Sequence, residues 1–600
     1  MCGIIGYAGS GRDREVLDVL LTGLSGLEYR GYDSAGVALA DDSISVMKRE
    51  GELEELEAAL EEHGSPTGNV GIGHTRWSTH GPPSDRNAHP HTDDEARVAV
   101  VHNGIIENYE HLREELSAAG YVFKSDTDTE VVPHMIRHYL EEGLDDEAAF
   151  RKAVSRLEGS YALAAVFRGS DTIYATRQDS PLVLGVADDG HYLASDVPAF
   201  IQYTDRVIYL EDGQFAALTG DEVTVSTADG TVVEPPVERV EWDAEDAGKS
   251  GYDHYMLKEI NEQPRSLRQC LRGRVDELEG EITVEELDEL PAPRRVQFVA
   301  CGTSYHAALY GELTLRERGV HAQTFLASEY DHGSVPIDEE TLVIGVTQSG
   351  ETADTLRALR QAKRMGASTL AVTNVVGSSA ARECDYTMYI RAGPEIGVAA
   401  TKTFATQQTA LTLVADAIKD GQRRELLGAL RSLPDHVQSI LDDSNAREIA
   451  AEYENAGAYF FIGRGYNYPV ALEGALKMKE ISYKHAEGFA AGELKHGPLA
   501  LVTDQTPVFA VVTGDGERAT KTIGNVKEVE ARGAPVVAVT DGRSDIERYA
   551  DHVLEIPDTH ERIGSILANV QLQLVSYWVA NRLDRSIDKP RNLAKSVTVE

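Results

Sequence analysis

The chain has 600 residues, of which 42% are hydrophobic and 26% are charged, values typical of a globular protein. A chain of this length is too long for one hydrophobic core and predicts about three or four domains. The 57 Lys and Arg residues against 99 Asp and Glu give a formal net charge of −42. Such a field disfavours nucleic acid and anionic membranes as partners. The acidic residues are spread among core segments, which indicates a solvated acidic surface suited to a salt-rich cytoplasm.

The four cysteines, Cys2, Cys270, Cys301 and Cys384, lie far apart and form no CxxC pair. This spacing disfavours a disulfide framework and favours a reducing compartment. No uninterrupted apolar run approaches the roughly 18 residues of a membrane span. The first residues also lack the basic flank and apolar core of a signal peptide. We therefore expect a soluble cytoplasmic protein.

The chain begins MCGIIGYAG, so removal of the initiator Met would leave Cys2 with a free α-amino group beside its thiol. Across residues 1–240, short apolar strands such as VGIGHTRW and YALAAVFRG are interspersed with helical patterns. This mixture predicts an α+β domain with helices covering β-sheets. A thiolate attacks amides, and an α-amine with a pKa of about 7.7–8.0 can accept its proton. The simpler alternative is that Cys2 merely begins a buried strand.

Polar residues follow several of these predicted strands, and each type suits an amide hydrolase that acts on an amino acid. The segment GHTRWSTHG supplies Arg76 and His80, VHNG supplies Asn103 and Gly104, and SDTDTE supplies Asp128. An Asn amide and a Gly N–H can form an oxyanion hole. An Arg can bind a substrate carboxylate with two hydrogen bonds, and an Asp can bind the ammonium group.

A competing interpretation treats the histidines of this region as a metal site. They include the AHPH segment, but no carboxylate or Cys falls at a recognised ligand spacing, so we expect no metal. The histidines concerned are His74, His80, His89, His91 and His102.

The segments MCGIIGY, LEYRGYDSAG, HTRWSTHG, HNGIIEN and SDTDTEV resemble the glutaminase domain of class II glutamine amidotransferases. That resemblance implies the N-terminal-nucleophile hydrolase fold, an αββα sandwich. It also implies that Cys2 is the nucleophile and that its own α-amine is the base. The remaining implied roles are glutamine binding by Arg76 and Asp128, an oxyanion hole at Asn103 and Gly104, an ammonia gate at Trp77, and a closing loop that contains His80.

Beyond residue 240 the chain passes through a linker and then repeats itself. Residues 241–285 contain an acidic run, a Gly-Ser stretch and a helix that we expect to end and restart near Pro264. FVACGTSYHAALYGELTLRE then aligns with FFIGRGYNYPVALEGALKMKE, so that Gly302 falls against Gly465 and Glu317 against Glu480. We expect two doubly wound α/β domains, at 286–435 and 445–590, with ligands at the carboxyl ends of their strands.

The two copies differ where ligands would bind. The first has TQSGET between a strand and a helix, a pattern typical of a phosphate site, and GTSYH adds two further hydroxyls. The second copy reads TGDGER instead, and its acidic side chains would repel a phosphate. The candidate phosphate-binding residues are Thr303, Ser304, Thr347, Gln348, Ser349 and Thr352.

The second copy carries charged groups that the first lacks. Glu473, Lys477 and Glu480 share one helix face at i, i+4 and i+7, and HAEGFAAGELKHGP follows with His496. In the first copy, Thr314 occupies the position of Lys477. We interpret one copy as built to hold an anion and the other as built to move protons. The alternative is an exposed, ion-paired helix face.

The motifs CGTSYHA, QSGETADT, EIGVAATKTF, ALEGALKMKEISYKHAEGFAAGELKHGPLAL and PRNLAKSVTVE resemble the glutamine–fructose-6-phosphate aminotransferase (isomerizing) family along essentially the whole chain. The resemblance implies two sugar isomerase (SIS) domains that bind D-fructose 6-phosphate, with L-glutamine as nitrogen donor. It implies no cofactor, and a homodimer in which His496 reaches the neighbouring subunit. A tail of residues 591–600 would close the sugar site.

The resemblance also assigns roles at the sugar site. Lys595 would form a Schiff base with the sugar C2 carbonyl, Glu480 would move a proton between C1 and C2, Lys477 would support Glu480, and His496 would open the ring. The phosphate-binding set named above would be joined by Val398 and Ala594. Position 347 is Thr where relatives often have Ser, which keeps the hydroxyl.

Two other functions are left open at this point. Among other class II amidotransferases, asparagine synthetase would need a pyrophosphatase loop of the SGG type and amidophosphoribosyltransferase an acidic phosphoribosyl-pyrophosphate loop, and neither pattern is found in the sequence. One that contains SIS domains could instead act on a different sugar phosphate. A sugar-phosphate-sensing SIS protein without catalysis would have no use for Cys2 or Lys595.

Overall fold

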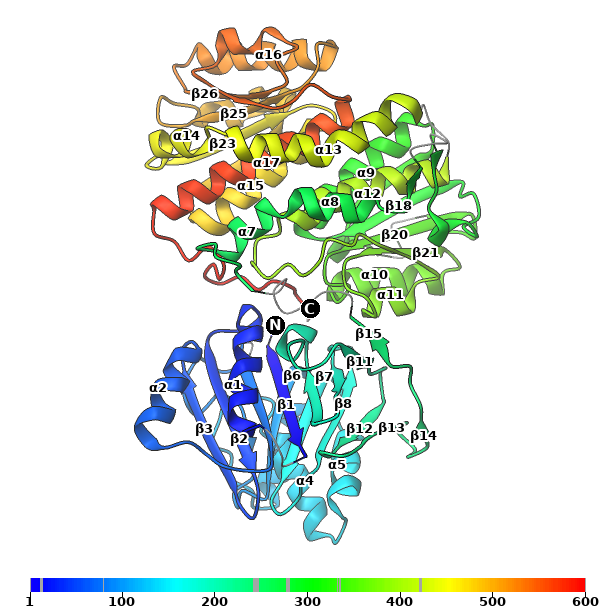
Figure 1. The fold of residues 1–600 in the computed structure, drawn as a ribbon, viewed down its shortest axis with the longest axis vertical. Coiled ribbons are helices and arrows are strands. Elements are labelled where there is room, and N and C mark those ends of the chain that lie inside the picture. Colours follow the sequence, from blue (N-terminus) through cyan, green and yellow to red (C-terminus); the bar gives the residue numbers. More distant parts are fainter. Residues whose placement is uncertain are drawn as a thin grey trace. The chain divides into compact units, whose positions relative to one another are not determined.

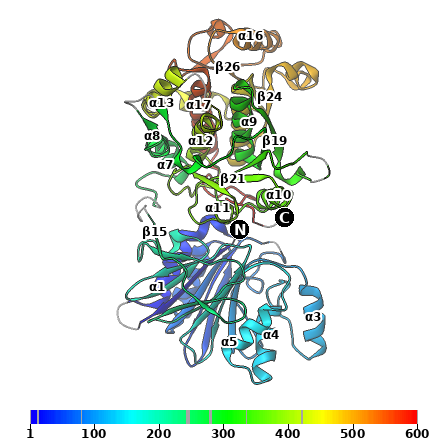
Figure 2. The same ribbon diagram turned by 90° about the vertical axis from the view of Figure 1, so that its right-hand side faces the viewer.

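The computed structural model describes residues 2–10, 14–78, 80–240, 248–276, 281–331, 333, 336–419 and 423–598. The chain divides into two compact units (Figures 1 and 2). The N-terminal unit comprises residues 1–248 together with the tail from Ala594, and the C-terminal unit comprises Lys249–Leu593.

The N-terminal unit is built on two antiparallel sheets. The first has the order β15-β11-β9-β10-β1-β4-β2-β3 and the second β14-β13-β12-β8-β7-β6-β5. The strands of the first sheet, in chain order, are β1 (Gly3–Gly9), β2 (Ser34–Ala40), β3 (Ile44–Glu50), β4 (Val70–Arg76), β9 (Val183–Val186), β10 (Gly190–Ala194), β11 (Arg206–Tyr209) and β15 (Glu238–Arg239). Those of the second are β5 (His91–Thr92), β6 (Val98–Ile106), β7 (Gly159–Phe167), β8 (Ile173–Gln178), β12 (Phe215–Leu218), β13 (Val223–Ser226) and β14 (Val232–Val233).

Helices cover the outer faces of these sheets and give three apolar cores. Helices α1 (Val16–Leu27) and α2 (Leu53–His63) pack on the first sheet, with Leu20 and Tyr192 in that core. Alternate residues such as Ile4 and Ala164 fill the space between the sheets. Helices α3 (Tyr109–Ala118), α4 (Val131–Glu141) and α5 (Asp146–Val154) cover the second sheet. The predicted αββα sandwich is confirmed.

The C-terminal unit begins with α7 (Tyr255–Asn261) and α8 (Gln263–Leu271), and Pro264 lies in the first turn of α8. The predicted end and restart of the helix at this proline is therefore confirmed, because Pro is tolerated in the first helical turn but not in a helix interior. The short strands β16 (Val275–Asp276) and β17 (Glu281–Ile282) pair with each other.

Two five-stranded parallel sheets then repeat one topology, with the orders β19-β18-β20-β21-β22 and β24-β23-β25-β26-β27. The first copy contains β18 (Arg295–Ala300), α9 (Gly302–Glu317), β19 (His321–Leu326), β20 (Thr341–Thr347), α10 (Ala353–Arg364), β21 (Ser368–Thr373), α11 (Ser379–Glu383), β22 (Tyr386–Tyr389) and α12 (Lys402–Ile418). The second contains α13 (Arg423–Asp443), α14 (Ala446–Tyr453), β23 (Ala458–Gly463), α15 (Asn467–Ser482), β24 (His485–Ala490), β25 (Val508–Val512), α16 (Glu517–Glu530), β26 (Val536–Thr540), β27 (His552–Glu555) and α17 (Glu561–Arg582). Both are doubly wound α/β domains, as predicted.

One hydrophobic core joins the two copies. Phe298 and Leu411 of the first copy belong to the same cluster as Phe461 and Leu572 of the second. Helix α17 is long and apolar enough to cross a membrane, but 94% of its most apolar window is buried inside the protein. This burial is what a central core helix requires.

Candidate functional sites

Cys2 lies directly before β1, beside the end of β4. The antiparallel pairing of these strands puts Gly3 opposite Thr75, so the start of the chain reaches the residues that follow β4. The Cys2 sulfur accepts a hydrogen bond from the Trp77 N–H at 3.2 Å. The carbonyl oxygen of Cys2 accepts one from Arg30 Nε at 3.1 Å and one from Asn103 Nδ2 at 2.9 Å. Cys2 is thus fixed at both its thiol and its carbonyl.

The electrostatic surroundings of Cys2 keep it a thiol. Burial raises its pKa, while the hydrogen bond from Trp77 and the charges of Arg76 and Arg30 lower it by less, so the net shift is upward. A thiol with a raised pKa needs a base to become a nucleophile at neutral pH. The site therefore has a chemical use for an α-amine next to the sulfur.

Asn103 and Gly104 are neighbours on β6, and the Asn103 side chain contacts Cys2. His74 Nε2 lies 3.1 Å from Asn103 Oδ1 and 3.0 Å from the His102 carbonyl, so it donates to both oxygens. This contact turns the Asn103 amide nitrogen toward Cys2. Gly104 has φ of +122°, and a Cβ at this position would lie 2.1 Å from the Ser160 oxygen. Only glycine fits here.

Arg76, the last residue of β4, contacts the backbone of His80. Arg76 Nη2 donates to the His80 carbonyl and, at 3.1 Å, to the Gly81 carbonyl. Within the described residues, Arg76 Nη1 is buried and has no hydrogen-bond partner. The rings of His80 and Tyr109 meet edge to face, with centroids 5.5 Å apart. A guanidinium with one buried, unpartnered nitrogen is well suited to a substrate carboxylate.

Asp128 is 4% exposed, and its Oδ2 accepts from the Ile106 N–H at 2.9 Å, which ties it to β6. Its segment is held by Glu130, which accepts from the backbone N–H groups of Lys124 and Ser125, each at 2.7 Å. The carboxylate is therefore fixed in the same region as Asn103.

The predicted ammonia gate, Trp77, packs against Tyr32: the two rings meet edge to face, with centroids 5.6 Å apart.

The buried histidines form a stacked array. His74 and His89 lie face to face at 4.2 Å, and His91 packs against His89 at 4.7 Å. Burial lowers the pKa of His74 to about 3 and holds those of His89 and His91 well below the ordinary value. In the part of the chain that the structure describes, no three His, Cys, Asp or Glu side chains are placed to hold a metal ion. The array consists of neutral, hydrogen-bonded imidazoles.

At the predicted sugar site, the residues of TQSGET form one turn between β20 and α10. Thr347 Oγ1 accepts from the Gly350 N–H at 3.2 Å and lies 3.1 Å from Thr352 Oγ1. Ser349 Oγ accepts from the Glu351 N–H at 3.1 Å. Thr347 is only 2% exposed, so its hydroxyl braces the turn, whereas Gln348, Ser349 and Thr352 are partly exposed.

Thr303 and Ser304 open α9, which follows β18. Because β18 and β20 are parallel neighbours, their carboxyl ends bring this helix start next to the TQSGET turn. Ser304 Oγ accepts from Gln407 Nε2 at 2.9 Å. All six candidate phosphate-binding residues therefore lie at one edge of one sheet.

The charged face of α15 is buried. Glu473 and Lys477 are both 0% exposed. Lys477 Nζ lies 3.3 Å from Glu473 and 2.5 Å from Glu480. Burial lowers the pKa of Lys477, but the two carboxylates raise it by more, so Lys477 is an ammonium. The alternative of an exposed ion-paired face is wrong.

Comparison with known proteins identifies the domain types of both the N-terminal and the C-terminal units. Residues 74–202 match the glutamine amidotransferase domain, and residues 289–417 and 452–581 each match the SIS domain. A curated glutamine–fructose-6-phosphate aminotransferase (isomerizing) from Halobacterium salinarum is 51% identical over 100% of both chains, and one from Symbiobacterium thermophilum is 50% identical over 100% of both. The chain belongs to this aminotransferase family.

A solved structure gives the same assignment for the C-terminal part. The C-terminal domain of glucosamine-fructose-6-phosphate aminotransferase from Francisella tularensis is 36% identical, with a TM-score of 0.53, and covers 57% of this chain and 99% of its own. The family fold is thus confirmed, whereas the precise domain boundaries remain predictions.

Four residues take their roles from the family resemblance alone. Val398 donates its N–H to the Asp588 carbonyl at 3.1 Å, in a loop of the C-terminal unit. His496 is exposed at the end of a short 3-10 helix, Ala491–His496. Lys595, with Ala594, is grouped with the N-terminal unit rather than with the unit that holds the other sugar-site residues. The roles of all four stay predictions.

Sequence reasoning missed two side chains of the sites. Arg30 is 4% exposed and holds the Cys2 carbonyl, and His306 binds Glu473 with Nδ1 2.7 Å from Oε2. The quoted segments LEYRGYDSAG and CGTSYHA contain both residues, so the resemblance carried a signal for them.

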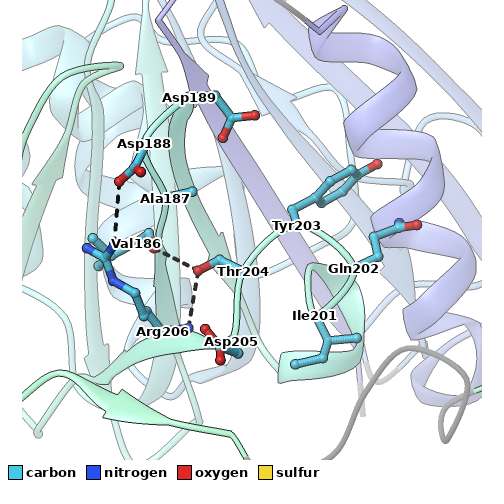
Figure 3. A pocket seen from close by; sticks show the side chains of 10 residues that line it. All are labelled: Val186, Ala187, Asp188, Asp189, Ile201, Gln202, Tyr203, Thr204, Asp205 and Arg206. Carbon is cyan, nitrogen blue, oxygen red and sulfur yellow. Dashed lines mark hydrogen bonds and ion pairs between the residues drawn. The ribbon is translucent and has the colours of Figure 1, made fainter.

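A surface hollow of about 420 Å³, lined by residues 186–189 and 201–206, contains none of the predicted site residues (Figure 3).

Proposed function

We propose that this protein transfers the amide nitrogen of L-glutamine to D-fructose 6-phosphate and isomerises the product, giving D-glucosamine 6-phosphate and L-glutamate. The observation that carries the proposal is the presence in one chain of two chemically different sites. One surrounds a Cys2 thiol with oxyanion donors, and the other puts a buried lysine–carboxylate cluster beside a hydroxyl-rich turn. Full-length relatives with this named activity support the same conclusion.

At the first site, the Cys2 sulfur attacks the glutamine amide and its α-amine, freed by removal of Met1, takes the thiol proton. Asn103 Nδ2 and the Gly104 N–H stabilise the oxyanion. The α-amine returns that proton to the leaving nitrogen as the tetrahedral intermediate collapses to a thioester and ammonia, and water then hydrolyses the thioester to glutamate and the free thiol. Arg76 and Asp128 bind the carboxylate and ammonium of the substrate. We assign ammonia gating to Trp77 and loop closure to the segment of His80.

At the second site, the phosphate is bound by Thr303, Ser304, Gln348, Ser349 and Thr352, while Thr347 shapes their turn and Val398 and Ala594 line the sugar. His496 opens the sugar ring. The Lys595 amine condenses with C2 and releases the C2 oxygen as water. Ammonia then displaces Lys595, and Glu480 carries a proton from C1 to C2, which yields the aldose.

These thioester, imine and proton-transfer steps use only groups of the chain, so the proposal invokes no cofactor. We further propose a cytoplasmic homodimer in which His496 serves the neighbouring subunit, with neither nucleic acid nor membrane as a partner. Mixing a His496→Ala chain with a Glu480→Gln chain tests the shared site. A mixed dimer has one intact sugar site of two, so the mixture should recover about one quarter of wild-type activity with random pairing and about one half if all dimers are mixed. Each variant alone stays inactive.

The decisive experiment supplies purified protein with amide-¹⁵N glutamine and fructose 6-phosphate and measures ¹⁵N-labelled glucosamine 6-phosphate by mass spectrometry. Cys2→Ala should abolish labelled product and leave sugar binding intact, while Cys384→Ala serves as the matched cysteine control. Sugar binding without any product would favour the non-catalytic SIS protein. Glutamine hydrolysis without transfer to this sugar would favour an amidotransferase with another acceptor.

A further inference from the structure

The two copies of the C-terminal unit meet at helices α9 and α15, and the repeat creates two related junctions there. With Gly302 aligned to Gly465, Thr303 corresponds to Tyr466 and His306 to Pro469. On the same alignment, Glu473, Lys477 and Glu480 correspond to Tyr310, Thr314 and Glu317. Each junction therefore pairs the start of one helix with the middle of the other.

At the first junction, the start of α9 meets the charged face of α15. Both oxygens of the fully buried Glu473 are occupied: His306 Nδ1 lies 2.7 Å from Oε2, and Thr303 Oγ1 donates to Oε1 at 3.0 Å. Lys477 Nζ in turn donates to Thr303 Oγ1 at 3.1 Å. A predicted phosphate ligand, Thr303, is thus hydrogen-bonded to both members of the buried ion pair.

The second junction is packed with two tyrosine rings and, among the described residues, has no histidine–carboxylate contact of the kind seen at the first. The rings of Tyr310 and Tyr466 pack with centroids 5.3 Å apart, and Tyr466 donates its O–H to Glu317 at 2.6 Å. Arg518, in the first turn of α16, also pairs with Glu317, at 3.3 Å. The two copies therefore contact each other at the second junction without a histidine, because Pro469 occupies the position that His306 holds at the first.

We propose that His306 is a positioning residue for the sugar reaction, acting from the first copy on Glu473 and, through it, on Lys477 and Glu480. The inference rests on the proposed function and adds to it a residue that acts through Glu473. It follows from the geometry: His306 occupies one oxygen of a fully buried carboxylate, and the other oxygen is shared by Thr303 and Lys477.

Loss of His306 would leave Glu473 Oε2 buried without its partner. Such a group is costly, and the carboxylate would turn toward the nearest cation. That cation is Lys477, which also lies 2.5 Å from Glu480. The ammonium would then move away from Glu480, and the carboxylate that transfers the proton would lose its fixed position. Sugar binding depends on the hydroxyl turn and changes less.

The test compares three variants of the full-length protein in the glutamine-dependent synthesis of glucosamine 6-phosphate. His306→Ala removes the contact, and His306→Asn restores a donor at the position of Nδ1. Tyr466→Phe is the matched control, since it removes the hydrogen bond between the copies at the second junction. For each we would measure kcat, KM for fructose 6-phosphate and Tm.

We expect His306→Ala to lower kcat about 10- to 100-fold, which corresponds to about 1.4–2.7 kcal/mol, with KM changed less than threefold. In His306→Asn, the logarithm of kcat should regain at least a third of the decrease seen in His306→Ala. Tyr466→Phe should lower Tm and leave kcat within about twofold of wild type.

Three results would overturn the inference: a wild-type kcat in His306→Ala, equal loss in the Ala and Asn variants, or equal loss in Tyr466→Phe. Failure of the proposed function looks different, because the wild-type protein itself would then make no glucosamine 6-phosphate.

Discussion

Lys477 illustrates how much one buried charge controls at the scale of a residue. Removing one partner from a buried ion pair costs about 3–5 kcal/mol. We therefore expect Lys477→Met to lose roughly that free energy of unfolding at pH 7, and to lose sugar turnover entirely. Urea unfolding measures the first effect and product formation the second. Lys479→Met is the matched control, because Lys479 is exposed on the same helix.

The stability lost in Lys477→Met should also depend on pH. Burial raises the pKa of Glu473, but Lys477 and the hydrogen bonds of two neighbours lower it by more, so the wild-type protein loses stability as pH falls below the ordinary Glu value of about 4.3. Without Lys477, burial raises the pKa of Glu473, and protonation relieves the uncompensated charge. The difference in the free energy of unfolding between the wild type and Lys477→Met should therefore become smaller between pH 7 and pH 5. A constant deficit would contradict the assigned ion pair.

The sequence spacing predicted that Glu473, Lys477 and Glu480 share a face, because i, i+4 and i+7 are fixed by helix geometry. It could not predict burial of that face, which depends on α9 from the other copy. His306 shows the same limit, since its partner lies 167 residues away. At the glutamine site, motif resemblance predicted Asn103, but the His74 contact that orients it depends on how the two sheets pack on each other.

At the scale of elements, the turn between β20 and α10 depends on one glycine. Gly350 has φ of +72°, and a Cβ there would lie 2.1 Å from Ser378 Oγ. Gly350→Ala should distort the turn and raise KM for fructose 6-phosphate at least about tenfold, because L side chains are disfavoured at positive φ. The measurement is steady-state kinetics with varied sugar phosphate.

The second copy supplies the control for this prediction. Gly514 takes the corresponding place, three residues before the start of α16; it has φ of +71°, and a Cβ there would meet nothing within 4 Å. Gly514→Ala should leave KM within about twofold of wild type. Equal effects of the two substitutions would mean that the first turn has no special part in sugar binding.

The internal repeat predicted two doubly wound domains, and both sheets have the same strand order. The continuous core that joins the copies was not predictable, because strand periodicity shows that a residue is buried but not which element covers it. Phe298 and Phe461 are buried equivalents whose shared cluster appears only in the fold.

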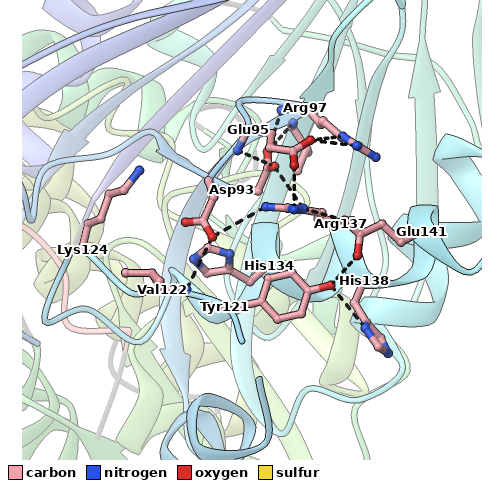
Figure 4. A network of polar contacts seen from close by, with 12 residues as sticks. Asp93, Glu95, Arg97, Tyr121, Val122, Lys124, His134, Arg137, His138 and Glu141 are labelled. Carbon is pink, nitrogen blue, oxygen red and sulfur yellow. Dashed lines mark hydrogen bonds and ion pairs between the residues drawn. The ribbon is translucent and has the colours of Figure 1, made fainter. Parts of the chain in front are cut away.

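At the scale of the whole molecule, acidic residues outnumber the cations that could pair with them. The network around Arg137 shows this locally: one guanidinium lies within 4.0 Å of carboxylate oxygens of Asp93, Asp94, Glu95 and Glu141 (Figure 4). With a net charge of −42, self-repulsion destabilises the compact state when counterions are scarce. Stability should therefore depend on salt.

The screening length falls from about 30 Å at 0.01 M salt to about 3 Å at 1 M, so nearly all relief of repulsion occurs within that interval. Each 1 kcal/mol relieved raises Tm by about 2–4 °C for a unit of 150–250 residues. We expect Tm to rise by at least about 5 °C between 0.01 and 1 M KCl, measured by calorimetry, with NaCl equivalent at equal ionic strength. Further gains above 1 M should appear with sulfate more than with chloride, because sulfate strengthens apolar burial. A Tm that stays flat up to 1 M KCl would show that local networks such as that of Arg137 already neutralise the surface. The acidic composition would then serve solubility rather than folding stability.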